Sequence, residues 1–183
     1  IDLFMFQQQK YCSNCGNEVV LKFAEGRDRI VCEHCTVIHY TNPKIVTGAL
    51  CVWENKVLLC RRAIEPRKGY WNLPAGYLED FEKAEDGAIR ETWEEAGAEI
   101  EIEKVLTVYN LPQANQVYIH FLAKLKDGII RNGEESIESA LFSEEEVPWK
   151  ELAFTSSAFA LRKFFEDRKT GFFNTHLGTF PEK

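Results

Sequence analysis

The sequence is poor in basic charge and has no long apolar run. Its 22 Lys and Arg residues stand against 29 Asp and Glu residues, so the 183-residue chain has a formal net charge of −7. This balance argues against a protein that mainly grips nucleic acid through phosphates, although a bound metal ion can reverse the local sign for a phosphate-bearing substrate. A membrane helix needs roughly 20 apolar residues in succession, so we expect no membrane contact.

The N-terminus also lacks the features of an export signal. The stretch "IDLFMFQQQK" has neither a basic start nor a small-residue cleavage site, and we expect the natural start near Met5 or upstream. We therefore expect a cytoplasmic protein, whose cysteines are reduced and bind metal rather than form disulfides. Of the six cysteines, Cys51 and Cys60 lie in apolar, strand-like runs and are expected to be small buried residues.

The other four cysteines form two C-x2-C pairs that are sixteen residues apart. They are Cys12, Cys15, Cys32 and Cys35. This spacing is typical of a zinc ribbon, in which two tight turns each present two thiolates to one tetrahedral Zn2+; two disulfides or a redox pair are the alternative. Because the protein fills all four positions, we expect a structural zinc without a catalytic role, in a unit spanning residues 11–40. Neighbouring His34 and His39 are not assigned as ligands.

From residue 44 onward, strand and helix patterns alternate. Periodicity predicts strands over 45–53, 56–62, 99–110, 116–125 and 139–142, helices over 83–96 and 156–169, and a loop over 67–79. A tight turn at Glu54-Asn55 makes the first two strands a hairpin, and Gly97 ends the first helix. We expect the second helix to be a packing element, and the whole to be an α/β sandwich.

Residues 76–98 concentrate negative charge, with eight acidic side chains against one Lys and one Arg. On a helix, Glu91 and Glu95 are four residues apart and share a face, which Glu94 flanks. Like charges at this spacing destabilise a helix by roughly a few tenths of a kcal/mol. Arg90 and hard divalent cations such as Mg2+ are the expected compensation, and a solvated acidic face is the alternative.

The spacing of this region follows the pattern G-x5-E-x7-R-E-x-x-E-E-x-G. Its fixed positions are Gly76, Glu82, Arg90, Glu91, Glu94, Glu95 and Gly97. The pattern resembles the Nudix box. It departs from the usual box at Phe81, where Gly is common, and at Thr92 and Ala98, where bulky aliphatic residues are usual.

The resemblance implies a Nudix hydrolase, which cleaves a nucleoside diphosphate linked to another group, with a Nudix α/β/α sandwich over residues 44–183. It implies that Glu91 and Glu95 bind Mg2+ or Mn2+ together with the backbone carbonyl of Ala75 or Gly76. It further implies that Glu94 serves a second metal ion.

The remaining roles that the resemblance implies concern the ion pair, the base and the substrate. Arg90 would pair with Glu82 and hold the box together. The general base would lie on a later loop, where Glu134, Glu135 and Glu138 are candidates and Glu138 ranks first because it precedes a strand. Tyr109 or Tyr118 could stack on adenine, although strand alternation equally allows both to be core residues.

Over residues 11–178 the chain is most similar to zinc-ribbon Nudix proteins of the plant FAD and ADP-ribose pyrophosphatase type. The stretches "GYWNLPAGYLE", "AIRETWEEAGA" and "LAFTSS" support this likeness, which implies release of AMP from FAD or ADP-ribose, and a homodimer. The NADH pyrophosphatases, which also remove NAD caps from RNA, are one alternative. Their "SQPWPFPxS"-like array is replaced here by "YNLPQANQVYIHF". A nucleotide-binding regulator whose ribbon touches nucleic acid is the alternative from another class.

Overall fold

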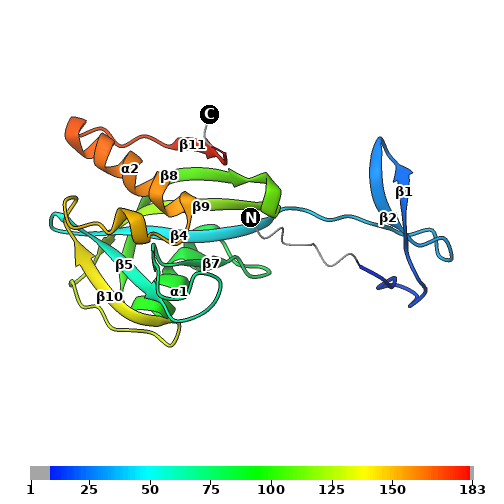
Figure 1. The fold of residues 1–183 in the computed structure, drawn as a ribbon, viewed down its shortest axis with the longest axis horizontal. Coiled ribbons are helices and arrows are strands. Elements are labelled where there is room, and N and C mark those ends of the chain that lie inside the picture. Colours follow the sequence, from blue (N-terminus) through cyan, green and yellow to red (C-terminus); the bar gives the residue numbers. More distant parts are fainter. Residues whose placement is uncertain (1–8, 182–183) are drawn as a thin grey trace. The chain divides into compact units, whose positions relative to one another are not determined.

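The computed structural model describes residues 9–181, so the expectation about Met5 lies outside the described residues. The chain divides into two compact units between Asn42 and Pro43. The described part of the first unit is a three-stranded antiparallel sheet with the order β1-β2-β3 (Figure 1). Its strands are β1 (Val20–Ala24), β2 (Arg27–Val31) and β3 (Ile38–His39).

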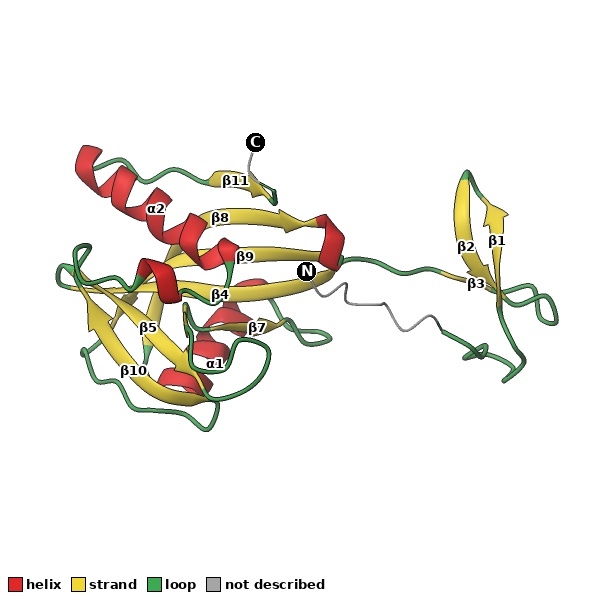
Figure 2. Cartoon of the chain, in the orientation of Figure 1, coloured by secondary structure: helices red, strands yellow, loops and turns green. Residues whose placement is uncertain are grey.

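The second unit is built on an eight-stranded sheet with the order β10-β5-β4-β9-β8-β11, in which β6 pairs with β5 and β7 with β4 (Figure 2). Its strands are β4 (Lys44–Trp53), β5 (Lys56–Arg62), β6 (Trp71–Asn72), β7 (Ala75–Tyr77), β8 (Ile100–Leu111), β9 (Gln116–Leu125), β10 (Ser136–Phe142) and β11 (His176–Thr179). Its helices are α1 (Ala84–Ala96) and α2 (Thr155–Thr170), with the short 3-10 helices η1 (Pro112–Ala114) and η2 (Trp149–Glu151).

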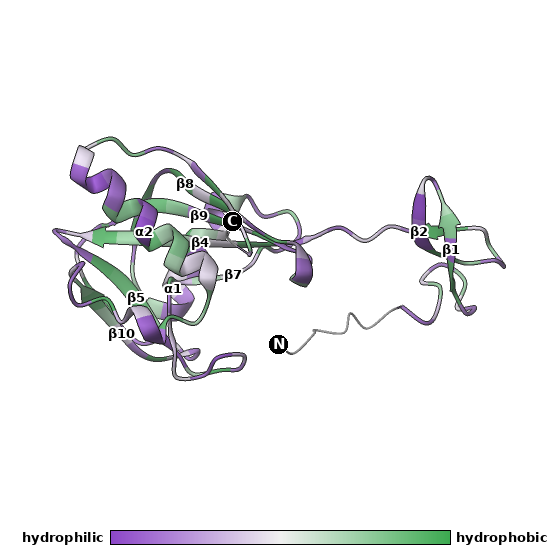
Figure 3. Ribbon diagram, turned by 45° about the horizontal axis from the view of Figure 1, so that its top comes forward, coloured by the Kyte–Doolittle hydropathy of each residue, from purple (hydrophilic) through white to green (hydrophobic). Residues whose placement is uncertain are grey.

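Strand alternation divides the core into two layers. On β4, Ala49 and Cys51 pack in a cluster with Ala88 of α1, whereas the intervening Leu50 packs in a cluster with Leu161 of α2. Successive side chains of a strand point to opposite faces, so α1 and α2 cover opposite faces of the sheet. The strands β4 and β5 are mostly green in Figure 3, as expected for strands that are covered on both sides. The predicted α/β/α sandwich is confirmed.

The sheet splits between β4 and β5, and residues from the stretch predicted as a loop fill the split. Strands β4 and β5 pair only next to their hairpin turn, at Val52↔Val57 and Trp53↔Lys56, and beyond it β6 pairs with β5 while β7 pairs with β4. The expectation of a loop through 67–79 was therefore wrong for five residues, those of the strands β6 and β7. The backbone groups of β6 and β7 form the hydrogen bonds that β5 and β4 no longer make with each other. This pairing joins segments that are distant along the chain, so the local Gly and Pro content does not reveal it.

Two further elements differ from expectation. Strand β10 begins at Ser136 rather than at residue 139, and β11 was not expected at all. Strand β11 pairs in parallel with β8, and the buried carboxylate of Asp167 holds the turn before it by accepting hydrogen bonds from His176 Nε2 and Asn174 N, both at 2.8 Å. Among the described residues, neither helix has the length and apolar composition that a membrane crossing requires.

Candidate active site

Helix α1 presents the predicted metal ligands to the split in the sheet. It ends at Gly97, whose φ of 54° is left-handed and whose N–H donates to Trp93 O, so the predicted stop is confirmed. Within the helix Glu95 is buried with 6% of its surface exposed, whereas Trp93 is exposed. The carboxylates therefore lie on the face of α1 that meets β7 and β4.

Glu95 contacts the backbone of β7 directly. Its Oε1 accepts a hydrogen bond from the N–H of Ala75 at 3.3 Å. Burial, together with the charges of Glu91 and Glu135, raises the pKa of Glu95 to about 8. Desolvation disfavours a charged carboxylate, whereas a bound cation would favour it.

Glu91 lies against Gly76, the first residue of the motif. A Cβ atom on Gly76 would stand 2.3 Å from Glu91 Oε1, a distance that atoms do not occupy, so only glycine allows the carboxylate to reach this backbone. Burial raises the pKa of Glu91, and the hydrogen bond from Arg90 opposes that rise. The contact explains why the motif needs Gly at this position.

Arg90 joins the acidic side chains into one network. Its Nε and Nη2 donate to Glu82 at 2.8 and 2.9 Å. Its Nη1 donates both to Glu91 Oε1 at 2.7 Å and to Glu94 Oε2 at 3.0 Å. The guanidinium lowers the pKa of Glu82. It also lies between the carboxylates of Glu91 and Glu94, where its positive charge offsets their repulsion.

These residues fit a hard divalent cation. Glu91 and Glu95 meet the backbone of Gly76 and Ala75, and the exposed Glu94 lies beside them on the same helix and accepts a hydrogen bond from Arg90. The donor set therefore consists of oxygen atoms, as Mg2+ and Mn2+ prefer. The residues that would hold the ion are Glu91, Glu94 and Glu95. The stretch before α1 brings the backbone of β7 to them.

The loop candidates for the base are separated by the fold. The charge of Glu135 acts on both Glu91 and Glu95, where it adds to the effect of burial on their pKa values. Glu138 instead pairs with Arg61, with 3.9 Å between Nη1 and Oε2. Its neighbour Ser139 faces the other way and donates to Glu95 O at 3.4 Å. The charge of Glu135 thus acts on the metal-site carboxylates, whereas Glu138 lies on the other face of β10 from Ser139 and next to Arg61.

The two tyrosine candidates lie in one core cluster with Val46 and Phe159. Tyr109 has no exposed surface, and its ring centroid is 5.2 Å from that of Phe159, which leaves no ring face for a base to stack on. Tyr118 is 9% exposed and donates to Gln116 Oε1 at 3.0 Å. Gln116 Nε2 in turn donates to the hydroxyl of the exposed Tyr77 at 2.8 Å. Tyr77 was not among the residues predicted from the sequence. Because Tyr77 directly follows Gly76, the first residue of the motif, its position in the sequence could have marked it as a candidate site residue.

The four predicted zinc ligands converge in the first unit. The sulfur atoms of Cys12, Cys15, Cys32 and Cys35 all lie within 4.8 Å of one another. The Cys12–Cys35 and Cys15–Cys32 sulfur distances are both 3.5 Å, close to the roughly 3.8 Å that a tetrahedron with Zn–S bonds of about 2.3 Å requires. The cluster therefore fits a structural zinc. His39 Nε2 lies 3.3 Å from Cys12 Sγ and contacts the cluster from outside.

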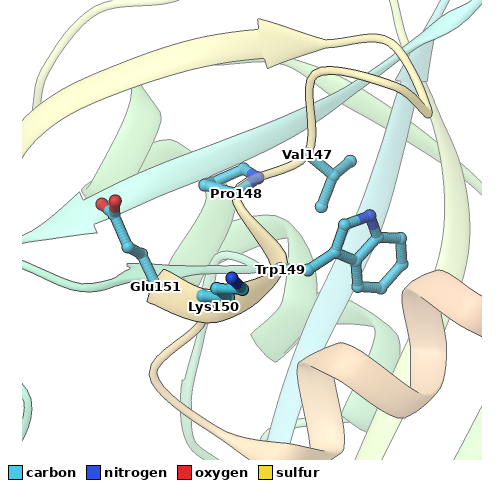
Figure 4. A pocket seen from close by; sticks show the side chains of 5 residues that line it. All are labelled: Val147, Pro148, Trp149, Lys150 and Glu151. Carbon is cyan, nitrogen blue, oxygen red and sulfur yellow. The ribbon is translucent and has the colours of Figure 1, made fainter.

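A shallow hollow lies elsewhere, around η2. It has a volume of about 300 Å³ and is lined by Val147, Pro148, Trp149, Lys150 and Glu151 (Figure 4). None of the residues that the motif identifies lines it. The hollow is therefore separate from the candidate metal centre.

Comparison with known protein families assigns both units of the chain. The NUDIX domain family matches residues 42–167, and the Nudix N-terminal zinc-ribbon family matches residues 10–41. The chain belongs to the Nudix family and is a Nudix hydrolase with an N-terminal zinc ribbon. Enzymes of this family use divalent metal ions to cleave the pyrophosphate bond of nucleoside diphosphate derivatives.

Three relatives indicate its neighbourhood within the family. A crystal structure of a NUDIX hydrolase from Nitrosomonas europaea is 47% identical, covers 94% of this chain and 99% of its own, and superposes with a TM-score of 0.90. The ADP-ribose pyrophosphatase of Methanocaldococcus jannaschii is 29% identical over 63% of this chain and 69% of its own. The NAD-capped RNA hydrolase NudC of Photorhabdus laumondii is 26% identical over 74% of this chain, which spans 51% of that protein.

Proposed function

We propose that this enzyme hydrolyses ADP-ribose or FAD, releasing AMP together with ribose 5-phosphate or FMN. The observation that carries the proposal is the placement of Glu91 and Glu95 against the Ala75–Gly76 backbone, which gathers oxygen ligands around one helix face. The similarity to the M. jannaschii ADP-ribose pyrophosphatase supports ADP-ribose. The sequence resemblance to the plant-type enzymes supports FAD.

The chemistry divides between metal and protein. Bound Mg2+ or Mn2+ would neutralise the pyrophosphate and make a water molecule more acidic. In the protein, Glu91 and Glu95 hold the cation, while Arg90 keeps Glu91 and Glu94 in place. Glu135 accepts the proton of the attacking water as general base.

The assignment of the base is tested by matched substitutions in one loop. A positioned base contributes about 10²–10⁴-fold to rate, so we expect Glu135→Gln to lower kcat by about 100-fold or more. Glu134→Gln and Glu138→Gln are the controls and should stay within about threefold of wild type, since Glu138 pairs with Arg61 instead and Glu134 is not proposed as the base. Loss of activity in Glu138→Gln alone would restore the order of candidates that the sequence suggested.

Substrate contacts are proposed for the hydrogen-bonded row of Tyr118, Gln116 and Tyr77. Tyr77 directly follows Gly76 in β7 and so joins this row, through the backbone, to the strand that meets Glu91 and Glu95. Tyr77 is 48% exposed. Lys44 Nζ lies 4.9 Å from the centroid of its ring, and the exposed part of the ring is the surface that would contact a nucleobase. We expect Tyr77→Ala to raise KM more than it lowers kcat, and an unchanged KM would remove Tyr77 from the binding site.

Hydrolysis of NADH or of NAD-capped RNA is the second candidate, because the NudC proteins match over three quarters of this chain. Purified protein should be incubated with Mg2+ and with FAD, ADP-ribose, NADH, NAD-capped RNA or nucleoside triphosphates, and the products separated by chromatography. We expect AMP with FMN or ribose 5-phosphate. Reduced NMN or decapped RNA as the main product would assign the chain to the second candidate, and no product from any of these would overturn hydrolysis.

A nucleotide sensor, whose ribbon touches nucleic acid, makes the opposite prediction. It would bind a nucleotide tightly without turnover, whereas an enzyme loses turnover in Glu94→Gln and still binds its substrate.

We further propose that the protein acts as a cytoplasmic homodimer, since reduced thiols suit the zinc cluster and the resemblance implies pairing. Sedimentation should then give about twice the chain mass of 21.1 kDa.

A further inference from the structure

The segment 131–136 is fastened to the last turn of α1. The backbone N–H of Arg131 donates to Ala96 O at 2.6 Å, and that of Gly133 donates to Glu95 O at 3.0 Å. The last carbonyls of a helix have no partner within the helix itself. The segment therefore completes the hydrogen bonding of the helix end that carries Glu91 and Glu95.

Gly133 lies closer to this helix end than a residue with a side chain could. A Cβ atom at Gly133 would stand 1.7 Å from the carbonyl oxygen of Glu94 and 2.8 Å from its carbonyl carbon. Both are backbone atoms and cannot rotate aside as a side chain can. An added methyl group must therefore move either the segment or the end of α1.

The same segment carries Glu135. The carbonyl of Gly133 accepts a hydrogen bond from Ser136 N at 3.1 Å, which closes a turn around Glu134 and Glu135, and Glu135 O accepts one from Ala63 N at 2.8 Å. The turn begins at the residue that touches α1. The position of Glu135 relative to α1 is thus set by the contact at Gly133.

We propose that Gly133 is a positioning residue for hydrolysis. Its lack of a side chain lets the segment lie on α1, so that Glu135 and the metal-site carboxylates Glu91 and Glu95 are held as one unit. The inference rests on the proposed function, because it requires Glu135 to act as the general base. A displacement of about 1 Å in such a unit can lower a rate by about 100-fold.

The first test is Gly133→Ala, assayed with the nucleotide that wild type cleaves fastest. We expect kcat to fall by about tenfold or more, while KM and the dissociation constant of Mn2+, measured by electron paramagnetic resonance, change by less than about threefold. Gly178→Ala is the matched control. Its Cβ would stand 2.6 Å from Tyr109 Cδ2 and 2.8 Å from Phe159 Cζ, so it disturbs packing without touching the segment and should leave kcat within about twofold of wild type.

A second variant avoids the steric conflict altogether. Asn132 is exposed and ties the segment to β10, because its Nδ2 donates to Ile137 O at 3.2 Å and its Oδ1 accepts from Ser139 N at 2.8 Å. We expect Asn132→Ala to fold normally and to lower kcat several-fold. Residues that act through one group are strongly non-additive, so neither Asn132→Ala nor Gly133→Ala should lower kcat further in a Glu135→Gln background.

Several results would overturn the inference. They are an unchanged kcat in folded Gly133→Ala, a loss of Mn2+ affinity that parallels the loss of kcat, and losses that multiply with that of Glu135→Gln. Full activity of Glu135→Gln would also overturn it, while leaving hydrolysis itself established. If the proposed function is wrong, the wild-type enzyme does not cleave the proposed substrates. If only this inference is wrong, wild type cleaves them and the kcat values of the variants differ from those expected.

Discussion

Arg90 and Glu82 form a two-pronged ion pair across the start of α1, with Nε–Oε1 and Nη2–Oε2 distances of 2.8 and 2.9 Å. The two residues are eight positions apart, and Glu82 precedes the helix. The pair therefore joins the lead-in segment to the helix, and the remaining nitrogen of Arg90 is left to bind Glu91 and Glu94.

Breaking this pair should destabilise the protein as well as reduce its activity. We expect Glu82→Gln to lower the free energy of unfolding by roughly 1–3 kcal/mol, because a charge-assisted, partly buried pair is lost. Arg90→Lys should act similarly, since an ammonium group cannot reproduce the planar fork. Urea unfolding followed by tryptophan fluorescence measures both. Glu85→Gln, an exposed change on the same helix, is the control, and equal losses in all three variants would contradict the prediction.

Glu95→Gln should separate activity from stability. We expect kcat to fall at least about tenfold, because the amide cannot hold the catalytic metal as a carboxylate does. The free energy of unfolding of the metal-free protein should fall little. Glu95 is buried and its pKa is raised to about 8, so at neutral pH the carboxyl group is mostly uncharged, and a neutral amide of the same size replaces it. Parallel steady-state kinetics and urea unfolding decide the point. A large and equal loss of both quantities would make Glu95 a structural residue.

Removal of zinc should unfold the ribbon and spare the hydrolase domain. Residues 11–40 have no large apolar core, so metal binding supplies their folding free energy. All four tryptophans, Trp53, Trp71, Trp93 and Trp149, lie in the second unit. After chelation we expect dispersed amide NMR signals to be lost from residues 11–40, while the tryptophan-detected thermal transition stays in place. A folded ribbon without any metal would refute this.

His39 should slow the release of zinc. Its Nε2 lies 3.3 Å from Cys12 Sγ, and its Nδ1 lies 3.4 Å from Gln9 Nε2. Outer contacts of this kind typically change metal affinity by about 10–100-fold. We expect His39→Ala to release zinc to a chromogenic chelator about tenfold faster, with His34→Ala, an exposed neighbour, as the matched control. Equal release rates in both variants would show that His39 does not support the cluster.

His120 should make the hydrolase domain less stable in mild acid. It is fully buried beside Thr107, whose Oγ1 lies 3.1 Å from Nδ1, and burial lowers the pKa of His120 from 6.5 to about 4. Between these two pH values the unfolded chain binds a proton that the folded protein does not. Stability is therefore retained above pH 6.5 and lost as the pH falls toward 4, by up to about 1.4 kcal/mol per pH unit.

The measurement is urea unfolding of the metal-free protein at several pH values, followed by tryptophan fluorescence. His120→Asn removes the titrating ring and should flatten the pH dependence between 4 and 6.5, even if the smaller side chain lowers stability throughout. An unchanged slope in this variant would show that other groups cause the acid sensitivity.

Local spacing predicted α1 and the grouping of its acidic side chains, because the relevant contacts lie within a few helical turns. Glu91, Glu94 and Glu95 share a face through the helix repeat alone, and Gly76 and Gly97 mark its lead-in and its end. The same holds for the cysteines, since each C-x2-C pair forms its own turn. The strands β6, β7 and β11 were missed because their formation depends on partners that are distant along the chain.

By itself, the sequence determined which groups are the candidate metal ligands: four thiolates for zinc, and one helix face of carboxylates for a divalent cation. Only the tertiary structure decided that Ser139, and not Glu138, points to that helix, since the face of β10 on which each lies depends on its pairing with β5. It also decided that Tyr109 is a core residue and that Gly133 touches α1. These features arise from contacts between distant segments, and such contacts leave no periodic trace in the chain.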